Sequence, residues 1–357
     1  GYLGRHVIFT PMAKSPGNKR CASAITNDLI VVFLMRMKAV LHLCYGPPAV
    51  LKIGTVAMPV ADEGEVLVRV HAATVNRTDA AMLRAKPFIM RFFTGLITPV
   101  KKILGTDFAG EVQSVGKGVT AFKPGDRVFG FDDGGLRSHA QYLSCPARKA
   151  LALIPDGISY PQAAASIEGA HYVINFLNKV SLKEGDRVLV NGASGAIGSA
   201  AVQLLKTKGA RVTAVCNTKN VPLMEPLGAE AVIDYEKEAF TRVKTQFHYI
   251  FDTVGKSSFW ECKPLLLPGG TYISSELGKG AQNPFLALAT PLLGGKKVKF
   301  PIPFHPAESV RQVQKLLATG KFNPVIDRTY PLESIVEAFE YVETGRKTGN
   351  VVLTIIE

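Results

Sequence analysis

A hydrophobic run that ends in a tight glycine turn constrains this chain more than any other segment. Residues 188–198 read Val-Leu-Val-Asn-Gly-Ala-Ser-Gly-Ala-Ile-Gly, and an apolar, helix-favouring stretch follows over 199–206. This order predicts a strand, a turn and a helix, in which Gly195 lets phosphates approach the backbone and Gly198 lets the helix pack on the strand. Because free N–H groups and a helix N-terminus attract anions, the segment predicts a dinucleotide site. A glycine-rich turn that binds no ligand is the alternative.

The turn departs from the usual Gly-x-Gly-x-x-Gly pattern at one position, since Ala193 stands where the first glycine is expected. Its context strengthens the prediction, because a second strand candidate follows the helix at residues 211–216. The residues predicted to hold the cofactor phosphates are Ala193, Ser194, Gly195, Ala196, Ile197 and Gly198.

Composition limits the remaining function classes. A chain of 357 residues, 47% hydrophobic and 20% charged, is typical of a globular protein with two domains. The five cysteines form no Cys-x-x-Cys pair, which argues against a structural zinc site and a disulfide framework and favours a reducing compartment. The formal net charge is +13, but no basic stripe is interleaved with aromatic residues, so nucleic-acid binding is not expected.

Residues 1–36 differ from the rest of the chain. The first 38 residues carry six lysines and arginines against one aspartate, and their apolar run over 29–35 is seven residues long. A bilayer span needs ~20 such residues. We expect this extension to be disordered or non-native, with Met35 or Met37 as the natural start; an organelle transit peptide is the alternative. No other segment predicts a membrane span, so we expect a cytoplasmic protein, or an organellar one if the extension is a transit peptide.

Two kinds of periodicity divide the chain from Met37 onward. Up to residue 157, short runs of alternating apolar and polar residues are separated by Gly and Pro, which predicts a β-rich domain. An alanine-rich helix is expected over 160–178. Beyond it the expected strands are 187–191, 211–216, 231–234, 248–253 and 270–275.

Alternation of these strands with helices predicts an α/β fold with a parallel, doubly wound sheet, which we assign to residues 158–321. Residues 322–357, with expected strands at 325–330 and 350–356, are predicted to rejoin the domain formed by 37–157.

The loop after the second strand of the sheet predicts which dinucleotide binds. A carboxylate there pairs with the ribose of NAD, whereas polar and basic residues suit the 2′-phosphate of NADP. Residues 216–220 read Cys-Asn-Thr-Lys-Asn and contain no acid. Asn217 and Thr218 are predicted to donate hydrogen bonds to the phosphate and Lys219 to pair with it, which favours NADPH. A solvated loop lysine is the alternative for Lys219.

From Met37 to its end the chain resembles the zinc-independent medium-chain dehydrogenases/reductases, above all the quinone oxidoreductases and the alkenal or enone reductases. The motifs that carry the resemblance are Val75-Asn-Arg-Thr-Asp79, Gly105-Thr-Asp-Phe-Ala-Gly-Glu-Val112, Phe122-Lys-Pro-Gly-Asp-Arg-Val128, the turn at 191–198, Leu227-Gly-Ala229, Val232-Ile-Asp-Tyr235, Phe251-Asp-Thr-Val-Gly255 and Thr348-Gly-Asn-Val-Val-Leu353. The resemblance implies a GroES-like β-rich catalytic domain with an inserted Rossmann domain, and a homodimer.

Zinc-dependent relatives of this family carry metal ligands that this chain lacks. Asn76 stands where they have a cysteine, and Thr106 and Asp107 stand where they have His-Glu. Asp107 and His139 are therefore expected to be structural, no metal site is predicted, and a zinc-dependent alcohol dehydrogenase is a distant alternative. A zinc ion would otherwise polarise a carbonyl as a Lewis acid.

Without metal, such a site transfers hydride to an acceptor that is already electrophilic, such as a quinone or an α,β-unsaturated carbonyl. Asn76 and Thr78 are the candidate catalytic residues, because an amide and a hydroxyl can stabilise charge on the reduced oxygen. For Asn76 a structural Asx turn is the alternative. A non-catalytic NADPH-binding scaffold is the alternative for the whole protein.

The resemblance also implies cofactor contacts at the ends of other strands, namely Tyr235 near the 2′-phosphate, Thr253, Val254 and Ser274 beside the nicotinamide, and Asn350 from the closing strand. The apolar loop over 86–93 is a candidate roof for an aromatic or lipid-derived acceptor, with simple packing between domains as the alternative.

Overall fold

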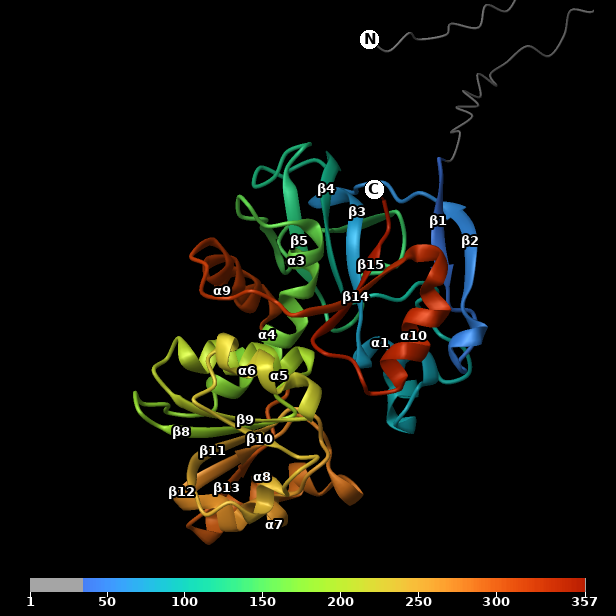
Figure 1. Cartoon of the computed structure of the whole chain (residues 1–357). Helices are drawn as coiled ribbons and strands as arrows, with labels where there is room; N and C mark the ends of the chain where they lie inside the picture. Colours follow the sequence, from blue (N-terminus) through green and yellow to red (C-terminus); the bar gives the residue numbers. More distant parts are fainter. Residues whose placement is uncertain (1–34, 357) are drawn as a thin grey trace, which may run out of the picture. The chain divides into compact units, whose positions relative to one another are not determined.

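The computed structural model describes residues 35–356 (Figure 1), within a compact unit that runs from Met35 to the end of the chain. Expectations for residues 1–34 therefore lie outside the described residues. Arg36, which the sequence analysis assigned to the extension, instead opens the first strand, because it pairs with Ala57 in a two-stranded hairpin.

The second half of the chain forms a six-stranded sheet in the order β10-β9-β8-β11-β12-β13, with every pairing parallel. Its strands are β8 (Arg187–Asn191), β9 (Arg211–Cys216), β10 (Ala231–Asp234), β11 (Phe247–Asp252), β12 (Leu266–Ile273) and β13 (Lys297–Lys299). The chain order reverses between β8 and β11, which is the point where doubly wound sheets bind ligands at their carboxyl edge.

Alternate side chains of β8 enter two different cores. Val188 and Val190 join the cluster that includes Leu204 of a flanking helix, whereas Leu189 joins the cluster that includes Phe259 on the other face. Because successive strand residues point to opposite faces, both faces of this sheet are buried, which explains the near-continuous apolar runs. The predicted α/β, doubly wound Rossmann arrangement is confirmed.

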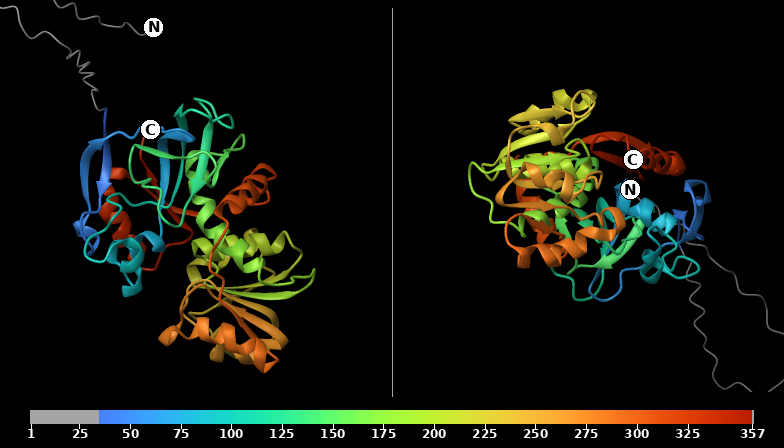
Figure 2. Two further views of the ribbon diagram at one scale, coloured as in Figure 1. Left: turned by 180° about the vertical axis from the view of Figure 1, so that it is seen from behind. Right: turned by 90° about the horizontal axis from the view of Figure 1, so that it is seen from below.

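Ten α-helices are described in residues 35–356, and their bounds are α1 (Arg77–Arg84), α2 (Arg91–Thr94), α3 (Tyr160–Ala165), α4 (Ile167–Leu177), α5 (Ala196–Lys206), α6 (Val221–Leu227), α7 (Phe259–Cys262), α8 (Gln282–Leu293), α9 (Pro306–Ala318) and α10 (Ile335–Glu343). In Figure 1 and in the left view of Figure 2, α3 and α4 lie where the two sheets of the protein meet.

The other sheet is mostly antiparallel and GroES-like, with the order β14-β15-β3-β4-β5-β7 and β6 paired on β3. Its strands are β3 (Glu65–Val75), β4 (Asp107–Val115), β5 (Arg127–Phe131), β6 (Tyr142–Pro146), β7 (Leu151–Leu153), β14 (Ile326–Pro331) and β15 (Asn350–Thr354), and the separate hairpin is β1 (Arg36–Leu41) with β2 (Lys52–Ala57). β15 pairs antiparallel with β3, so the last strands do return to the first sheet.

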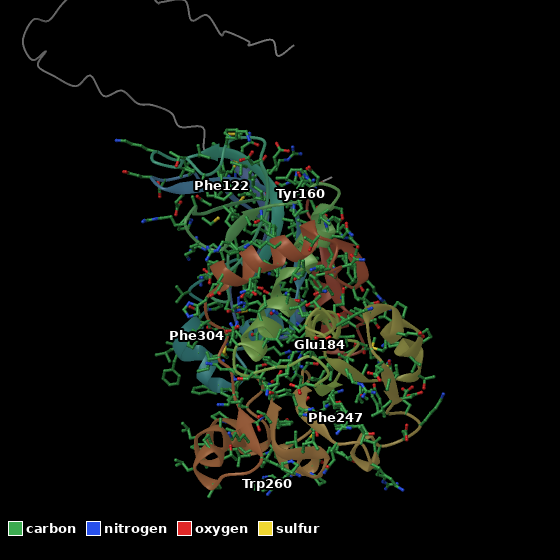
Figure 3. All side chains as sticks on the ribbon, turned by 90° about the vertical axis from the view of Figure 1, so that its left-hand side faces the viewer. Phe122, Tyr160, Glu184, Phe247, Trp260 and Phe304 are labelled. Carbon is green, nitrogen blue, oxygen red and sulfur yellow. The ribbon has the colours of Figure 1, made fainter. Side chains whose placement is uncertain are left out.

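Three details differ from the sequence-based expectations. The helix predicted over 160–178 is interrupted at Ser166, whose hydroxyl bonds back to the Ala163 carbonyl. Helix α8 and the short edge strand β13 were not predicted, because Pro291 and the glycine pair after the helix conceal both periodicities. In Figure 3, Phe122 of the loop before β5 lies at the top and Phe247 of β11 lies toward the bottom, with Phe304 between them.

Candidate active site

The glycine turn is shaped by backbone contacts that exclude side chains. A Cβ atom on Gly198 would lie 2.1 Å from the Gly192 carbonyl oxygen, so only glycine lets α5 begin this close to β8. Gly192 has φ of 79°, a left-handed conformation that favours glycine. A Cβ on Gly195 would meet nothing closer than 3.6 Å, so this position leaves an open cradle above the first turn of the helix. The turn therefore fits a pyrophosphate.

The loop before β15 closes on this turn from the other domain. The Gly349 N–H donates to the Ser194 carbonyl at 2.7 Å, and the Lys347 ammonium donates to the Gly349 carbonyl at 2.6 Å. Burial lowers the pKa of Lys347 to about 8, against an opposing attraction from Glu168. Sequence analysis missed this lysine, because nothing local links residue 347 to the turn.

Asn350, the residue of this loop that the sequence analysis assigned to the cofactor, is buried with its amide donating to the Val325 carbonyl at 3.0 Å. The Asn350 side chain is therefore bonded within its own sheet, whereas the preceding residue, Gly349, contacts the glycine turn.

The loop after β9 carries the residues that were predicted to meet the 2′-phosphate. Lys219 donates to the Arg346 carbonyl at 3.2 Å, and the Asn217 side chain accepts from the amide of Asn220 at 2.6 Å. Tyr235 is exposed beside them, with its backbone N–H bonded to the Cys216 carbonyl.

Two acids that the sequence analysis did not consider reach this loop from the end of β10. The Thr218 hydroxyl donates to Asp234 at 2.6 Å, and its backbone N–H donates to Glu236 at 3.0 Å. Thr218 therefore holds these carboxylates in the observed arrangement. Hydrogen bonding by Thr218 keeps the pKa of Asp234 below its usual range.

The residues predicted beside the nicotinamide lie at the carboxyl edge of the sheet. The Thr253 hydroxyl donates to the Asn191 carbonyl at 2.8 Å, Val254 would contact any Cβ on Gly192, and Ser274 is fully buried at the end of β12. Arg77, at the start of α1, donates to the Val254 carbonyl at 3.4 Å and lies 3.5 Å from Glu276. These contacts bring the first turn of α1 to the strand ends.

Asn76 sits in a buried polar cluster beneath that turn. Its amide nitrogen donates to the Thr74 hydroxyl at 2.6 Å and to Asp107 at 3.0 Å, while its Oδ1 is buried without a partner in the described part of the chain. The free atom is thus an acceptor and suits a ribose hydroxyl, whereas the amide hydrogens are engaged within the protein.

Asp107 and His139 complete this cluster. Asp107 accepts from the Thr74 backbone N–H at 2.8 Å, and His139 Nε2 lies 2.9 Å from the Thr74 carbonyl. Burial raises the pKa of Asp107 to about 7, and burial lowers that of His139. Within residues 35–356, no three His, Cys, Asp or Glu side chains come together as metal ligands would.

Thr78 links the two domains through a contact with Glu168, a residue that the sequence analysis did not single out. Its hydroxyl donates to Glu168 of α4 at 2.6 Å. The next residue, Gly169, packs against the start of α5, since a Cβ there would lie 2.6 Å from the Ala196 carbonyl. Thr78 and Glu168 are therefore next to the cofactor turn. His171, farther along α4, is fully buried and bonds Ser309.

Comparisons with known proteins agree with this geometry. Residues 62–156 match the family described as alcohol dehydrogenase GroES-like domain, and residues 227–353 match the one described as zinc-binding dehydrogenase. A trans-enoyl reductase of Aspergillus terreus is 30% identical over 82% of this chain and 87% of its own length. The chain belongs to the medium-chain dehydrogenases/reductases.

Other members of this family resemble the chain over most of its length. The chloroplastic NADPH-dependent alkenal/one oxidoreductase of Arabidopsis thaliana is 28% identical over 97% of this chain and 86% of its own. The structure of the quinone oxidoreductase from Coxiella burnetii superimposes with a TM-score of 0.79 and 26% identity, covering 90% of this chain and all of that one. The predicted family resemblance is confirmed.

The glycine turn yields a test that separates folding from cofactor binding. We expect Gly198→Ala to destabilise the protein by about 1–3 kcal/mol, because the new methyl overlaps the Gly192 carbonyl. Gly195→Ala has room for its methyl and should fold normally, yet it should weaken NADPH binding at least tenfold by filling the cradle. Chemical denaturation and fluorescence titration measure the two effects, and equal stabilities of the two variants would contradict this account.

The buried carboxyl Asp79 predicts a pH-dependent stability. Burial raises its pKa to about 7 from an ordinary 3.8, so the folded state binds more protons than the unfolded state between these values. Stability should then fall as pH rises from about 4 to 7, by at most about 1.4 kcal/mol per pH unit from this group. Asp79→Asn should flatten that slope in urea denaturation from pH 5 to 8, whereas exposed Asp156→Asn should not. An unchanged slope for Asp79→Asn would refute the assignment.

Proposed function

We propose that the protein is an NADPH-dependent reductase of quinones or α,β-unsaturated carbonyls that works without zinc. The observation that carries the proposal is the contact between Thr78 and Glu168 beside the pyrophosphate turn, which brings the catalytic domain to the cofactor-binding edge. The alkenal/one and trans-enoyl relatives support the acceptor class. NADPH supplies a hydride, and the protein aligns the acceptor and stabilises the negative charge that develops on its oxygen.

The turn at 193–198 would hold the pyrophosphate, and the Asn76 Oδ1 would accept from the nicotinamide ribose. Lys219 and Arg346 would meet the 2′-phosphate, since the lysine reaches the backbone of the arginine and both carry positive charge. Asn217, Thr218 and Tyr235 line the same loop, and Thr253, Val254 and Ser274 lie at the strand ends beside the nicotinamide. Discrimination against NADH then depends on these cations outweighing Asp234 and Glu236.

Zinc independence rests on residue types. Asn76 and Thr106 are poor zinc ligands, and zinc sites are built from Cys, His and carboxylates. Asp107 is the one carboxylate among these positions, and it already accepts bonds from Thr74 and Asn76. Charge stabilisation on the acceptor therefore falls to hydrogen-bond donors of the protein rather than to a metal ion.

The acceptor is expected to be apolar. Phe88 and Phe92 stay largely exposed in the segment 86–93 and contact each other edge to face, with ring centres 6.1 Å apart. If this segment covers the acceptor, as the sequence predicts, its exposed aromatic groups suit an aromatic or lipid-derived molecule. No helix in residues 35–356 is long and apolar enough to cross a membrane. We place the protein in the cytoplasm, or in an organelle if the extension acts as a transit peptide.

Steady-state assays test this function directly. Purified protein should oxidise NADPH in the presence of a quinone or an enal, and it should use NADH at least tenfold less efficiently. Lys219→Ala should lose most of that preference, because one ion pair to the 2′-phosphate is removed.

A matched control is Lys208→Ala, an exposed lysine on the same domain that lies away from the loop after β9. Tight NADPH binding without turnover on any acceptor would instead support a non-catalytic scaffold. Activity that follows stoichiometric zinc content would contradict metal independence.

We also propose a homodimer that pairs along the edge of the parallel sheet. β13 has one neighbour, β12, among the described strands, and adjacent α8 exposes Phe285, Leu288, Leu292 and Leu293, the last two at 88% and 80%. An open strand edge beside an apolar face favours association. Light scattering should give twice the monomer mass, and Leu288→Asp with Leu292→Asp should give a monomer. A monomeric wild-type protein would refute the dimer.

A further inference from the structure

The segment that follows α1 presents large apolar side chains to solvent. Five of them form the apolar patch, and their exposed fractions lie between 60% and 86%: Phe88, Phe92, Leu96, Ile97 and Val100. Folded proteins rarely leave several large apolar groups exposed within one short segment unless another surface binds them. The patch lies between α1 and β4, so it is separate in the chain from the exposed face of α8.

Contacts beneath the patch hold it as one outward-facing surface. The Arg91 guanidinium lies 5.8 Å from the ring centre of Phe88 and 4.9 Å from that of Tyr45, and its Nη1 donates to the Leu96 carbonyl at 3.2 Å. The Tyr45 hydroxyl donates to the Gly95 carbonyl at 2.7 Å. These contacts fasten the backbone of the segment to residues before α1, and the apolar groups remain on its outer side.

The charges around the patch have one sign. Residues 80–106 contain five lysines and arginines and no acid. Arg84 pairs with Glu343 of α10. Lys86 and Lys102, which flank the patch in the chain, are exposed, and neither makes an ion pair within residues 35–356. Apolar groups between free cations complement a surface that is anionic outside and apolar beneath.

We propose that the apolar patch docks on a lipid bilayer that contains anionic lipid. The aromatic and aliphatic side chains enter the boundary between the headgroups and the acyl chains, where aromatic rings are favoured. The long side chains of Lys86 and Lys102 reach the lipid phosphates at the edge of the patch. The protein then lies on the membrane surface and does not span it.

Charge favours this occupant over three others. A second copy of the chain would bring the same cations face to face, which opposes association. Residues 1–34 carry four lysines and arginines against one acid, so this extension is repelled as well. A nucleic acid would pair with the cations but leave the apolar groups without a partner. A bilayer with anionic headgroups satisfies both kinds of side chain.

Helix α1 joins the patch to the candidate active site. Thr78 lies in its first turn, and Lys86 follows its C-cap, Ala85. The helix has eight residues. At 1.5 Å per residue it spans ~12 Å. Docking therefore brings the site close to the membrane, where apolar molecules concentrate. This extends the proposed function with a source for an apolar acceptor, but the docking itself does not depend on the reductase activity.

Quenching of tryptophan fluorescence by lipid tests which face docks. The chain has one tryptophan, Trp260, on α7 of the parallel-sheet domain. Phe92→Trp combined with Trp260→Phe moves the fluorophore into the patch. Vesicles of equal parts phosphatidylcholine and phosphatidylglycerol with brominated acyl chains should quench this variant by at least half. Trp260 of the wild-type protein should keep its intensity, because its domain faces away from the lipid.

Co-sedimentation of the full chain with the same vesicles, without bromine, tests the apolar contact. Val100→Asp should weaken binding at least tenfold, because it places a charge in the apolar boundary and repels the anionic headgroups. Val60→Asp is the matched control, since Val60 and Val100 are both 75% exposed and the change in charge is the same. It should keep the affinity within twofold.

The contribution of the cations is tested separately. Lys86→Gln combined with Lys102→Gln should weaken vesicle binding at least fivefold, and added salt should weaken the wild type in the same direction. Lys179→Gln combined with Lys183→Gln removes the same charge from exposed positions on the other domain and should stay within twofold. Vesicles of phosphatidylcholine alone should bind the wild type at least tenfold more weakly.

Four results would overturn the docking. They are a wild-type protein that binds neither kind of vesicle, equal affinities of Val100→Asp and Val60→Asp, equal affinities for anionic and neutral vesicles, and quenching of Trp260 in place of the Phe92→Trp variant. A halved mass of Val100→Asp in light scattering, with vesicle binding unchanged, would instead make the patch an interface between copies. These assays contain no NADPH and no acceptor, so their outcome is independent of whether the proposed reductase activity is found.

Discussion

The close approach of α5 to β8 is the constraint on which the rest of the site depends. The space between Gly198 and the Gly192 carbonyl is too small for any side chain. That approach places the first turn of α5 at the carboxyl edge of the sheet, where its free N–H groups face the open side of Gly195. Gly169 packs α4 against this same turn, so this backbone contact and the bond from Thr78 together position Glu168. The cofactor cradle and Glu168 therefore depend on the same close packing of backbone.

The polar cluster below α1 explains how family positions that bind zinc elsewhere are used here. Thr74, Asn76 and Asp107 bond one another, and Asp79 accepts the Asn76 backbone N–H at 2.9 Å, which caps the helix. A residue buried in such a network is rigid, which favours precise placement of the adjacent Thr78. The Asn76 amide bonds Thr74 and Asp107 within this network, and its catalytic role stays a prediction.

Much of the fold follows from local patterns, and the site follows only in part. Strands β8, β9 and β10 were predicted from apolar runs, because both faces of the sheet bury them. The glycine turn was predicted because its steric requirement is local. Glu168 and Lys347 were not, because their positions depend on contacts between residues far apart in sequence, such as Thr78 with Glu168. The acids beside Thr218 were missed for the same reason. The loop after β9 is also bordered by the end of β10, and the sequence analysis considered only the end of β9.

Hydride transfer is proposed to occur where the two domains meet, and hydrogen bonds and an ion pair join them there. Gly349 to Ser194, Thr78 to Glu168 and Arg77 to Glu276 join the sheets around the site. The ion pair of Arg77 is exposed and contributes little, whereas the Thr78 bond is part-buried and its loss leaves the buried Glu168 carboxyl without that partner. A shift that opens this joint therefore costs most at the Thr78 contact. The Thr78 bond therefore helps to hold the domains in the arrangement that the proposed hydride transfer requires.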